Sequence, residues 1–451
     1  MSFLIIALKN EYSQSSDWPQ FNTTLLAKRL CPYDLPLKQQ IISRQIQIYY
    51  NDFSELKLEE LRTPSGHREE PNSAWVKIQF NYEGLQLLTD PLGQCPIWIA
   101  ETEQVYALSP ETKSFSAIPN FQLEMKDDDY FLKVKRRRVD ESDFKNVKKL
   151  SPGGALTFDS TNFRLQEIKK PLPWHLAGID FVPDLTEAQN LLTLALQQSA
   201  DDLPKQNVGS LLSGGIDSSV ATFLSKERTD LKTTFNLKTE LGSEEADSQE
   251  TSKHFGLKSE TLVYPTDLTR SYFESVIHSN ELTDGLTAEI LLQMKAIVDL
   301  LPVDLDNIVT GYGADLLFGG MLGHKAYMFV TGTSDTESLL DRAYWSKELT
   351  PFYYWEKRKR LFNLFWHPQV IAAALRIPLL MQQIKAEKYV LRTLAVRNQW
   401  LTEPLAFRKK TGMTNGTNIN FMLSNALVLP NEHEYDQKNQ ITLELFKKVF
   451  N

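Results

Sequence analysis

The chain has 451 residues, 42% of them hydrophobic and 11% aromatic, with a net formal charge of −8. This length predicts two domains with ample core, and the acidic balance argues against a general nucleic-acid binder, whose surface would be basic. With two cysteines and seven scattered histidines, we expect neither a disulfide framework nor a zinc cluster. No apolar segment is long enough to cross a bilayer, so we expect a cytoplasmic protein without a membrane partner.

The chain up to about residue 165 carries short alternating segments separated by turn signals, which predict strands in a mostly antiparallel layer. Such segments occupy residues 75–80, 97–100 and 154–158. The initial apolar run, residues 1–8, lacks a basic leader and a cleavage site, so it predicts a first strand rather than a signal peptide. Two prolines in residues 169–174 indicate a linker, since proline resists both helix and central strand.

From residue 184 the hydrophobic period becomes helical. Asp184 and Glu187 resemble a capping box ahead of an apolar helix face. Strands are then predicted at residues 207–212, 231–237, 259–264 and 307–310. Helices are predicted near residues 217–226, 244–255, 266–279 and 287–300. Alternating strands and helices favour a parallel α/β sheet covered on both faces. The chain beyond about residue 340 is predicted to be mainly helical.

A short polar loop follows the first of these strands. It reads Ser213-Gly214-Gly215-Ile216-Asp217-Ser218-Ser219. Glycines let the backbone approach a ligand, the next helix start offers free N–H groups to an anion, and an aspartate can hold a divalent cation against phosphate oxygens. No Gly-Lys-Ser/Thr follows, so this is not a Walker A loop. We therefore predict an ATP and pyrophosphate site formed by Leu211, Ser213, Gly214, Gly215, Asp217, Ser218 and Ser219. The alternative is an ordinary strand-to-helix turn.

A second glycine-flanked turn follows the strand at 307–310 and carries another carboxylate. It begins Gly311-Tyr312-Gly313-Ala314-Asp315. Because parallel strands end at the same edge of a sheet, Asp217 and Asp315 are predicted to converge on one Mg²⁺ ion that bridges the triphosphate. A glycine-rich loop needed only for packing is the alternative.

The order SGGxDSS resembles the PP-loop of the N-type ATP pyrophosphatases, and residues 75–425 resemble the asparagine synthetase class. Residues 90–97 are similar to that family's DPLG turn, and residues 150–154 to its LPPG turn. The resemblance implies an α/β protein that uses ATP and Mg²⁺. Residues 1–168 would form a degenerate N-terminal-nucleophile glutaminase-like αββα domain. Residues 180–451 would form a PP-loop parallel-sheet synthetase domain with a helical C-terminal part.

The sequence departs from the glutamine-hydrolysing members at position 2. Those enzymes expose a catalytic cysteine after the initiator methionine, whereas this chain has Ser2, and Cys31 and Cys95 lie far from the terminus. The N-terminal domain is therefore predicted to be a scaffold, and glutamine is not expected to be the nitrogen donor. A serine acting as the N-terminal nucleophile is the less favoured alternative.

Asparagine synthetases carry Gly-Glu-Gly where this chain has Gly311-Tyr312-Gly313, and here it resembles β-lactam and carbapenam synthetases. The resemblance implies that Tyr312 pairs with Glu348 to deprotonate an amine, and that Lys410 lies over the transition state. The chemistry agrees, because an alkyl ammonium needs a base, tyrosine's pKa near about 10 matches an amine, and lysine neutralises departing AMP. A core tyrosine, a surface carboxylate and a solvated lysine are the plain alternatives.

Further binding residues are implied by the same resemblance. The predicted substrate contacts are Glu244, Asp284, Gly311, Tyr312 and Asp315. Glu244 begins an acidic helix start, which favours carboxylates whether or not substrate binds there. Phe235 and Leu237 are predicted to flank adenine, and ordinary strand core is their alternative.

The favoured hypothesis is an ATP- and Mg²⁺-dependent ligase that closes a β-lactam ring on an amino-acid-type substrate in secondary metabolism. A macrolactam-forming peptide cyclase, an amide ligase using ammonia or another amine, and an inactive nucleotide-binding protein remain as alternatives. A homo-oligomer is possible, and no nucleic-acid partner is expected.

Overall fold

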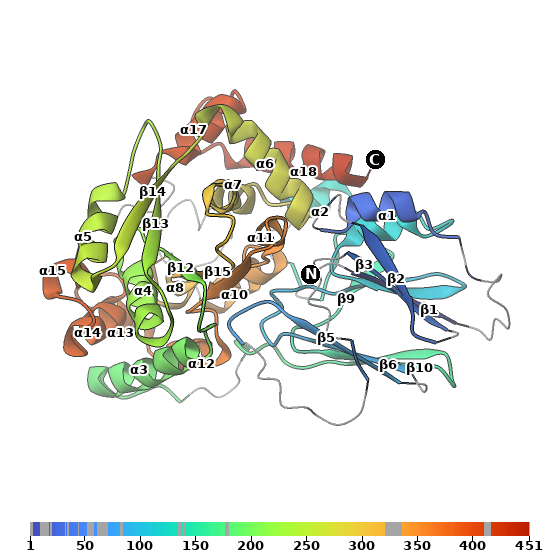
Figure 1. Ribbon diagram of the computed structural model, residues 1–451, viewed down its shortest axis with the longest axis horizontal. Helices are drawn as coiled ribbons and strands as arrows, with labels where there is room; N and C mark the ends of the chain where they lie inside the picture. The colour runs from blue at the N-terminus through green and yellow to red at the C-terminus, as the bar shows by residue number, and fades with distance from the viewer. Residues whose placement is uncertain are drawn as a thin grey trace.

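The computed structural model shows a sheet sandwich at the N-terminus beside a larger α/β unit (Figure 1). The elements assigned below are β-strands, α-helices and short 3₁₀ helices (η). The structure describes residues 3–9, 18, 20–31, 33, 36–43, 45–51, 58–60, 71–81, 84–133, 137–138, 140–175, 180–320, 336–409 and 416–450. Two residues singled out above, Ser2 and Lys410, lie outside these described ranges.

Two sheets form the N-terminal sandwich, our name for residues 3–168. The first has the order β2-β3-β1-β8-β7-β9 and is antiparallel. Its strands are β1 (Phe3–Leu8), β2 (Leu37–Ile41), β3 (Ile46–Asn51), β7 (Trp98–Glu101), β8 (Val105–Ser109) and β9 (Val147–Lys149). The second has the order β11-β10-β6-β5-β4, with only the β4–β5 pair parallel. Its strands are β4 (Leu58–Glu60), β5 (Val76–Asn81), β6 (Gly84–Thr89), β10 (Ala155–Asp159) and β11 (Arg164–Ile168).

The first strand is buried on both faces because alternate residues of a strand point to opposite sides. Phe3 and Ile5 belong to the core between the two sheets. Leu4 and Ile6 belong to a second core on the outer side of the first sheet. That side is covered by α1 (Thr23–Arg29), η2 (Thr112–Ala117) and α2 (Asp128–Lys133). The described residues thus give one helical layer and two sheets of the predicted αββα arrangement, and Figure 1 shows no described helix over the second sheet.

The second unit is built on a five-stranded parallel sheet of order β14-β13-β12-β15-β16. Its strands are β12 (Val208–Leu211), β13 (Thr233–Lys238), β14 (Lys258–Val263), β15 (Asn307–Thr310) and β16 (Arg360–Asn363). The predicted parallel α/β sheet is confirmed. The sequence missed β16, since four residues within a region of helical pattern carry no strand period of their own.

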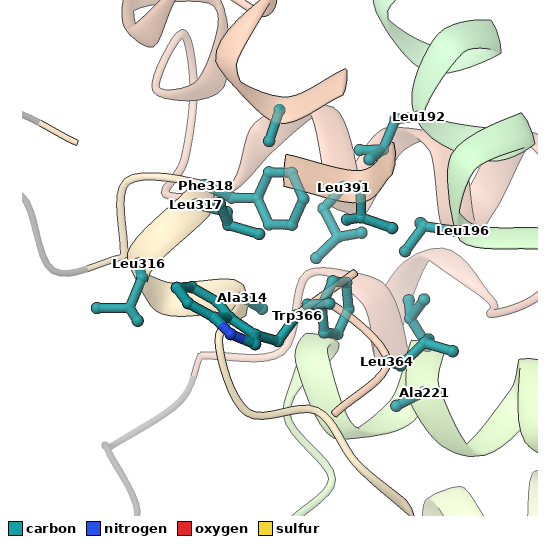
Figure 2. Packing of buried hydrophobic residues seen from close by; sticks show 14 of the residues in the cluster. Leu192, Leu196, Ala221, Ala314, Leu316, Leu317, Phe318, Leu364, Trp366 and Leu391 are labelled. Carbon is teal, nitrogen blue, oxygen red and sulfur yellow. The ribbon is translucent and has the colours of Figure 1, made fainter. Parts of the chain in front are cut away.

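Helices cover both faces of this sheet. Adjacent residues of β15 point to opposite faces and belong to different cores. Val309 joins the core formed with α3 and α4, whereas Ile308 joins the core formed with α6 and α7. Figure 2 shows the first of these cores, where Leu192, Ala221 and Leu391 meet Phe318 and Trp366.

The helices up to the second turn are α3 (Leu185–Asp201), α4 (Ile216–Arg228), α5 (Glu245–Phe255), η3 (Thr266–Leu268), α6 (Thr269–Asn280), α7 (Gly285–Leu300) and α8 (Ala314–Leu317). Beyond it lie α10 (Thr336–Trp345), α11 (Phe352–Trp355), α12 (Pro368–Leu375), α13 (Leu379–Gln382), α14 (Tyr389–Arg397), α15 (Glu403–Ala406), α17 (Ile419–Ala426) and α18 (Tyr435–Phe450).

The strand order reverses at β12. The chain builds β13 and β14 on one side of it and then returns to add β15 and β16 on the other side. Open α/β sheets bind ligands at such a switch point, beyond the carboxyl ends of the strands. The two glycine-flanked turns predicted from the sequence follow β12 and β15, so they lie side by side there.

Candidate active site

The loop after β12 is held in shape by its own serines. The backbone N–H of Ser213 donates to Ser218 Oγ at 3.1 Å, and the two hydroxyls lie 3.0 Å apart. Ser218 Oγ also reaches the carbonyl of Gly215 at 3.2 Å. Gly215 precedes the first turn of α4 without a side-chain cap, so N–H groups of that helix start remain for an anion.

Two glycines bring neighbouring segments against this loop. Gly214 has φ +80°, and a Cβ there would lie 2.6 Å from the backbone of Asp247 in α5. A Cβ on Gly311 would lie 2.6 Å from the backbone of both Asp217 and Ser218. Atoms this close exclude any side chain, so the turn after β15 touches the first turn of α4 directly. The predicted meeting of the two loops is therefore present in the structure.

A lysine joins the two predicted metal-binding carboxylates. Lys388 Nζ lies 2.5 Å from Asp217 Oδ2 and also forms an ion pair with Asp315 Oδ1. Burial opposes the charge of this lysine, but the two carboxylates outweigh it and raise its pKa above the ordinary value. Sequence reasoning missed Lys388, which lies at the start of α14 with a left-handed backbone (φ +58°).

The residues around this lysine fit a magnesium–nucleotide complex. Asp217 Oδ1 and Ser219 Oγ are buried without a hydrogen-bond partner, so the loop holds polar atoms that the protein itself does not satisfy. No cluster of three or more His, Cys, Asp or Glu that could hold a metal occurs among the described residues. Mg²⁺ needs no such cage, because it is usually held by one or two carboxylates together with phosphate oxygens and water.

Beside Asp217 and Asp315 the structure places a relay of four polar side chains, in which Tyr312 is partly buried and Glu348, Arg342 and Asp284 are buried. Tyr312 Oη donates to Glu348 Oε1 at 2.6 Å. The other oxygen of Glu348 accepts from Arg342 at 2.7 Å, and Arg342 also donates to Asp284 at 2.5 Å. Arg342 is only 1% exposed, so its charge is neutralised by these two carboxylates rather than by water. The predicted partners Tyr312 and Glu348 are thus in contact, and Arg342 is a member that the sequence did not reveal.

The predicted substrate contacts occupy different positions. Asp284 caps α7 by accepting from the N–H of Thr287 at 2.7 Å and also binds Arg342, which favours a positioning role over direct substrate contact. Glu244 lies at the start of α5, and its carboxylate is within 3.1 Å of the Cβ position of Gly416.

Phe235 and Leu237, predicted to flank adenine, are 3% and 5% exposed and belong to the apolar core. The Phe235 ring lies across Gly209 and lines a pocket at the amino ends of the strands, with Val208 and Leu305. This end of the sheet is opposite the loop at residue 213. The positions favour strand core for both side chains.

The chain that leads to Lys410 is tied to the loop after β12. The guanidinium of Arg408 donates to the carbonyls of Gly214 at 3.1 Å and Asp247 at 3.0 Å, and it pairs with Glu250 at 2.5 Å. Lys410 itself is outside the described residues, and its predicted role stays a prediction. Arg408, two residues before Lys410, nevertheless holds this segment beside the loop at residues 213–219.

The fold and these two loops define an α/β unit of the PP-loop type. Residues 195–364 match the family model described as asparagine synthase. This segment contains both glycine-flanked turns, Tyr312 and Glu348. The match shows that this segment is similar to the asparagine synthase family. A comparison with curated protein sequences gave no match.

Two solved structures are similar over somewhat more than half of the chain. One is the NMN synthetase of Francisella tularensis, with 12% identity, a TM-score of 0.26, and coverage of 59% of this chain and 96% of that one. The other is the NH₃-dependent NAD synthetase of Campylobacter jejuni, with 14% identity, a TM-score of 0.26, and coverage of 60% and 94%. In the described part of this chain, no helix has the length and apolarity needed to span a bilayer.

Proposed function

We propose that this protein is an ATP-dependent ligase that activates a carboxylate as an acyl-adenylate and then closes a lactam ring with the amine of the same substrate. The observation that carries the proposal is the 2.6 Å hydrogen bond from Tyr312 to Glu348, directly beside a PP-loop. A carboxylate-backed tyrosine suits the removal of a proton from an ammonium group, whereas an enzyme that takes up free ammonia has less need of such a base.

In the first step a substrate carboxylate oxygen attacks the α-phosphorus of ATP, forming an acyl-phosphate bond and releasing pyrophosphate. The loop 213–219 would bind the leaving phosphates through backbone N–H groups and hydroxyls. Lys388, a buried cation beside the loop, would neutralise negative charge there. Asp217 and Asp315 would hold Mg²⁺, which supplies further charge neutralisation when bound.

In the second step the substrate amine attacks the acyl carbon, and AMP leaves with the bonding electrons. The phenolic proton of Tyr312 would move along its hydrogen bond to Glu348 Oε1 as Tyr312 Oη accepts the proton of the amine. Arg342 fixes the second oxygen of Glu348, so the carboxylate is oriented before substrate arrives. Holding both reacting groups in one site raises their effective concentration, which closure of a strained ring requires.

The test is to incubate the purified protein with ATP, Mg²⁺ and a panel of β-amino acids while AMP, pyrophosphate and cyclised product are measured. We expect AMP and pyrophosphate together with a product that has lost one water. Release of ADP and phosphate as the only nucleotide products would overturn the proposal. Activity only with a peptide substrate or only with added ammonia would assign the same fold to a macrolactam cyclase or an ammonia ligase instead. Glutamine is not expected to release glutamate, because position 2 is Ser2.

A further inference from the structure

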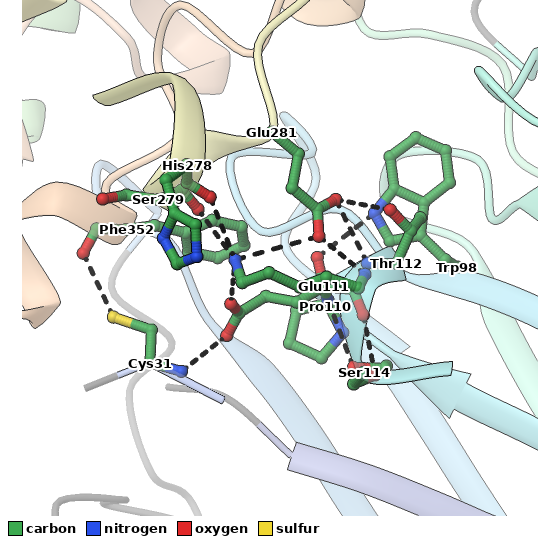
Figure 3. Close-up of polar contacts among 12 residues, drawn as sticks. Cys31, Trp98, Pro110, Glu111, Thr112, Ser114, His278, Ser279, Glu281 and Phe352 are labelled. Carbon is green, nitrogen blue, oxygen red and sulfur yellow. Dashed lines mark hydrogen bonds and ion pairs between the residues drawn. The ribbon is translucent and has the colours of Figure 1, made fainter. Parts of the chain in front are cut away.

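The surface between the N-terminal sandwich and the α/β unit contains charged side chains that are completely buried. Glu111, Lys113 and Glu281 are each no more than 1% exposed. Figure 3 shows the polar contacts around Glu111 and Glu281. Burying ions is costly, and replacing a buried ion pair by apolar residues is often neutral or stabilising. Such a network is therefore weak evidence for stability. Its contacts instead fix the position of the sandwich relative to the end of α6.

Glu281 is one of the residues through which the sandwich contacts the α/β unit. Its carboxylate accepts from the hydroxyl of Thr112 at 2.7 Å and from the backbone N–H groups of Thr112 and Lys113 at 3.1 and 2.8 Å. Lys113 Nζ donates to the carbonyls of His278 and Ser279, the last turn of α6, at 3.2 and 3.3 Å. The end of α6 is thus fixed by η2 of the sandwich from two directions.

The same short segment leads directly to the relay behind Tyr312. Three residues after Glu281 comes Asp284, which binds Arg342, and Arg342 in turn binds Glu348. Between them, the hydroxyl of Thr283 accepts from Arg137 of the sandwich at 2.9 Å. A displacement of Glu281 would therefore be passed along three residues to the cation that orients Glu348.

A second connection reaches Glu348 through its own neighbour. Lys347 has a left-handed backbone (φ +63°) and is buried, and its ammonium donates to the carbonyl of Glu281 at 2.7 Å. The same ammonium lies 3.5 Å from Asp143 of the sandwich. Glu348 is thus tied to Glu281 through its side chain by way of Arg342 and through its backbone by way of Lys347.

Close packing accompanies these contacts. Gly93, in the turn that the sandwich shares with the asparagine synthetase pattern, has φ +65°, and a Cβ there would lie 2.4 Å from the ring of Tyr344. Tyr344 lies at the end of α10, four residues before Glu348. No atom can be inserted at this contact, so the turn at residue 93 fixes the end of α10 from which the Glu348 segment leaves.

We propose that the N-terminal sandwich is a positioning element for the Tyr312–Glu348 pair and acts through Glu281 and Lys347. This inference rests on the proposed function for the importance of the pair, but the contact itself can be tested without any substrate. Glu281 is a positioning residue, since no contact among the described residues links it to the loop at residues 213–219. The sandwich would thus serve the amide-forming half of the reaction.

The experiment places 3-fluorotyrosine at position 312 and records its ¹⁹F resonance in the full chain without substrate. A Glu348→Gln variant gives the displacement expected when the partner of the phenol changes. We expect Glu281→Gln to displace or split the resonance in the same direction. Thr112→Val keeps the shape of the threonine side chain but removes the hydroxyl that donates to Glu281. We expect this variant to displace the resonance by a smaller amount.

Glu289→Gln is the matched control. Glu289 forms an equally buried carboxylate–lysine pair with Lys438 at 2.5 Å, also on the α/β unit, but has no described contact with the relay. In Glu289→Gln, the ¹⁹F resonance of the fluorotyrosine at residue 312 should have the same chemical shift as in the parent protein. An unmoved resonance in folded Glu281→Gln would overturn the proposal, as would an equal displacement in Glu289→Gln. If Glu281→Gln does not fold, Thr112→Val decides by the same criteria. The ¹⁹F measurement uses no substrate, so its result does not depend on whether the protein closes a lactam ring. The two proposals can therefore fail independently.

Discussion

Lys388 Nζ lies 2.5 Å from Asp217 Oδ2, although 171 residues separate the two in the chain. The same ammonium pairs with Asp315, so one cation neutralises the carboxylates that follow two neighbouring strands. Without it, two negative groups would face each other, one of them 96% buried. The arrangement leads to a prediction that needs no knowledge of the substrate.

Lys388→Met should lower thermal stability in the absence of divalent cations. Loss of one partner of a buried pair costs up to about 3–5 kcal/mol, and less is expected here because the Asp315 side chain is 48% exposed. Millimolar Mg²⁺ should restore part of the loss, since it replaces the ammonium between the carboxylates. Thermal-shift titration with Mg²⁺ measures this. Lys438→Met, which breaks the buried pair with Glu289, is the control and should gain nothing from Mg²⁺.

Tyr312→Phe should separate the two half-reactions. The ring and its packing remain, but the proton acceptor is lost, so acyl-adenylate formation continues while amine attack slows by about 10²–10⁴-fold. Glu348→Gln should show a similar but milder loss. Substrate-dependent ATP–pyrophosphate exchange and product formation, measured side by side, check this. Product formation at the parent rate in Tyr312→Phe would remove the main support for lactam closure.

Lys149 makes stability depend on pH. Its side chain is buried in β9 with its ammonium 3.7 Å from the ring of Tyr344, and burial, together with the nearby charge of Lys347, lowers its pKa to about 7. Because the folded pKa lies below the unfolded value, the folded state binds fewer protons between the two. The cost of burying Lys149 to the free energy of folding is therefore complete below pH 7. This cost disappears as the pH rises toward the pKa of the lysine in the unfolded chain.

Lys149→Met should accordingly be more stable than the parent at pH 7, by about 1–3 kcal/mol. The difference should shrink steadily as the pH approaches 10. Denaturant unfolding of both proteins at a series of pH values gives this difference directly and cancels the titration of all other groups. A difference that is constant across the range would show that Lys149 is charged in the folded protein throughout.

Gly311→Ala should impair both half-reactions. The added methyl would lie 2.6 Å from the backbone of α4, so the turn that carries Tyr312 must move away from the loop. We expect about 1–3 kcal/mol of destabilisation together with loss of pyrophosphate exchange. Gly256→Ala is the control, because Gly256 has φ +68° but no atom within 4 Å of its Cβ position. It should cost about 1 kcal/mol of backbone strain and leave exchange intact.

The local parts of the site could be predicted from the sequence, because their structure is set by adjacent residues. The loop at residue 213 and the turn at 311 follow strands that end where the apolar runs end, and their glycines lie where backbones touch. The order of strands and helices from 185 to 310 is confirmed for the same reason. The pairing of Tyr312 with Glu348 came from family resemblance and not from any local pattern.

Residues that act over long sequence distances were missed. Lys388 has a left-handed backbone that its residue type does not favour, in a region where only helical periodicity is visible. Arg342 looks like any arginine in an amphipathic helix until the fold places two carboxylates beside it. Asp284 was predicted only as a substrate contact, since its bond to Arg342 depends on packing between helices.

The burial of β1 on both faces bears on how the molecule unfolds. Leu4 and Ile6 share one uninterrupted apolar core with Phe273 of α6 and Phe446 of α18. Exposing this core to water would therefore expose the sheet and the helices on either side of the predicted linker together. We therefore expect heat or denaturant to melt the two units together, because they share this core. The predicted boundary near residue 170 would then mark a change in sequence pattern without a break in thermodynamic cooperativity.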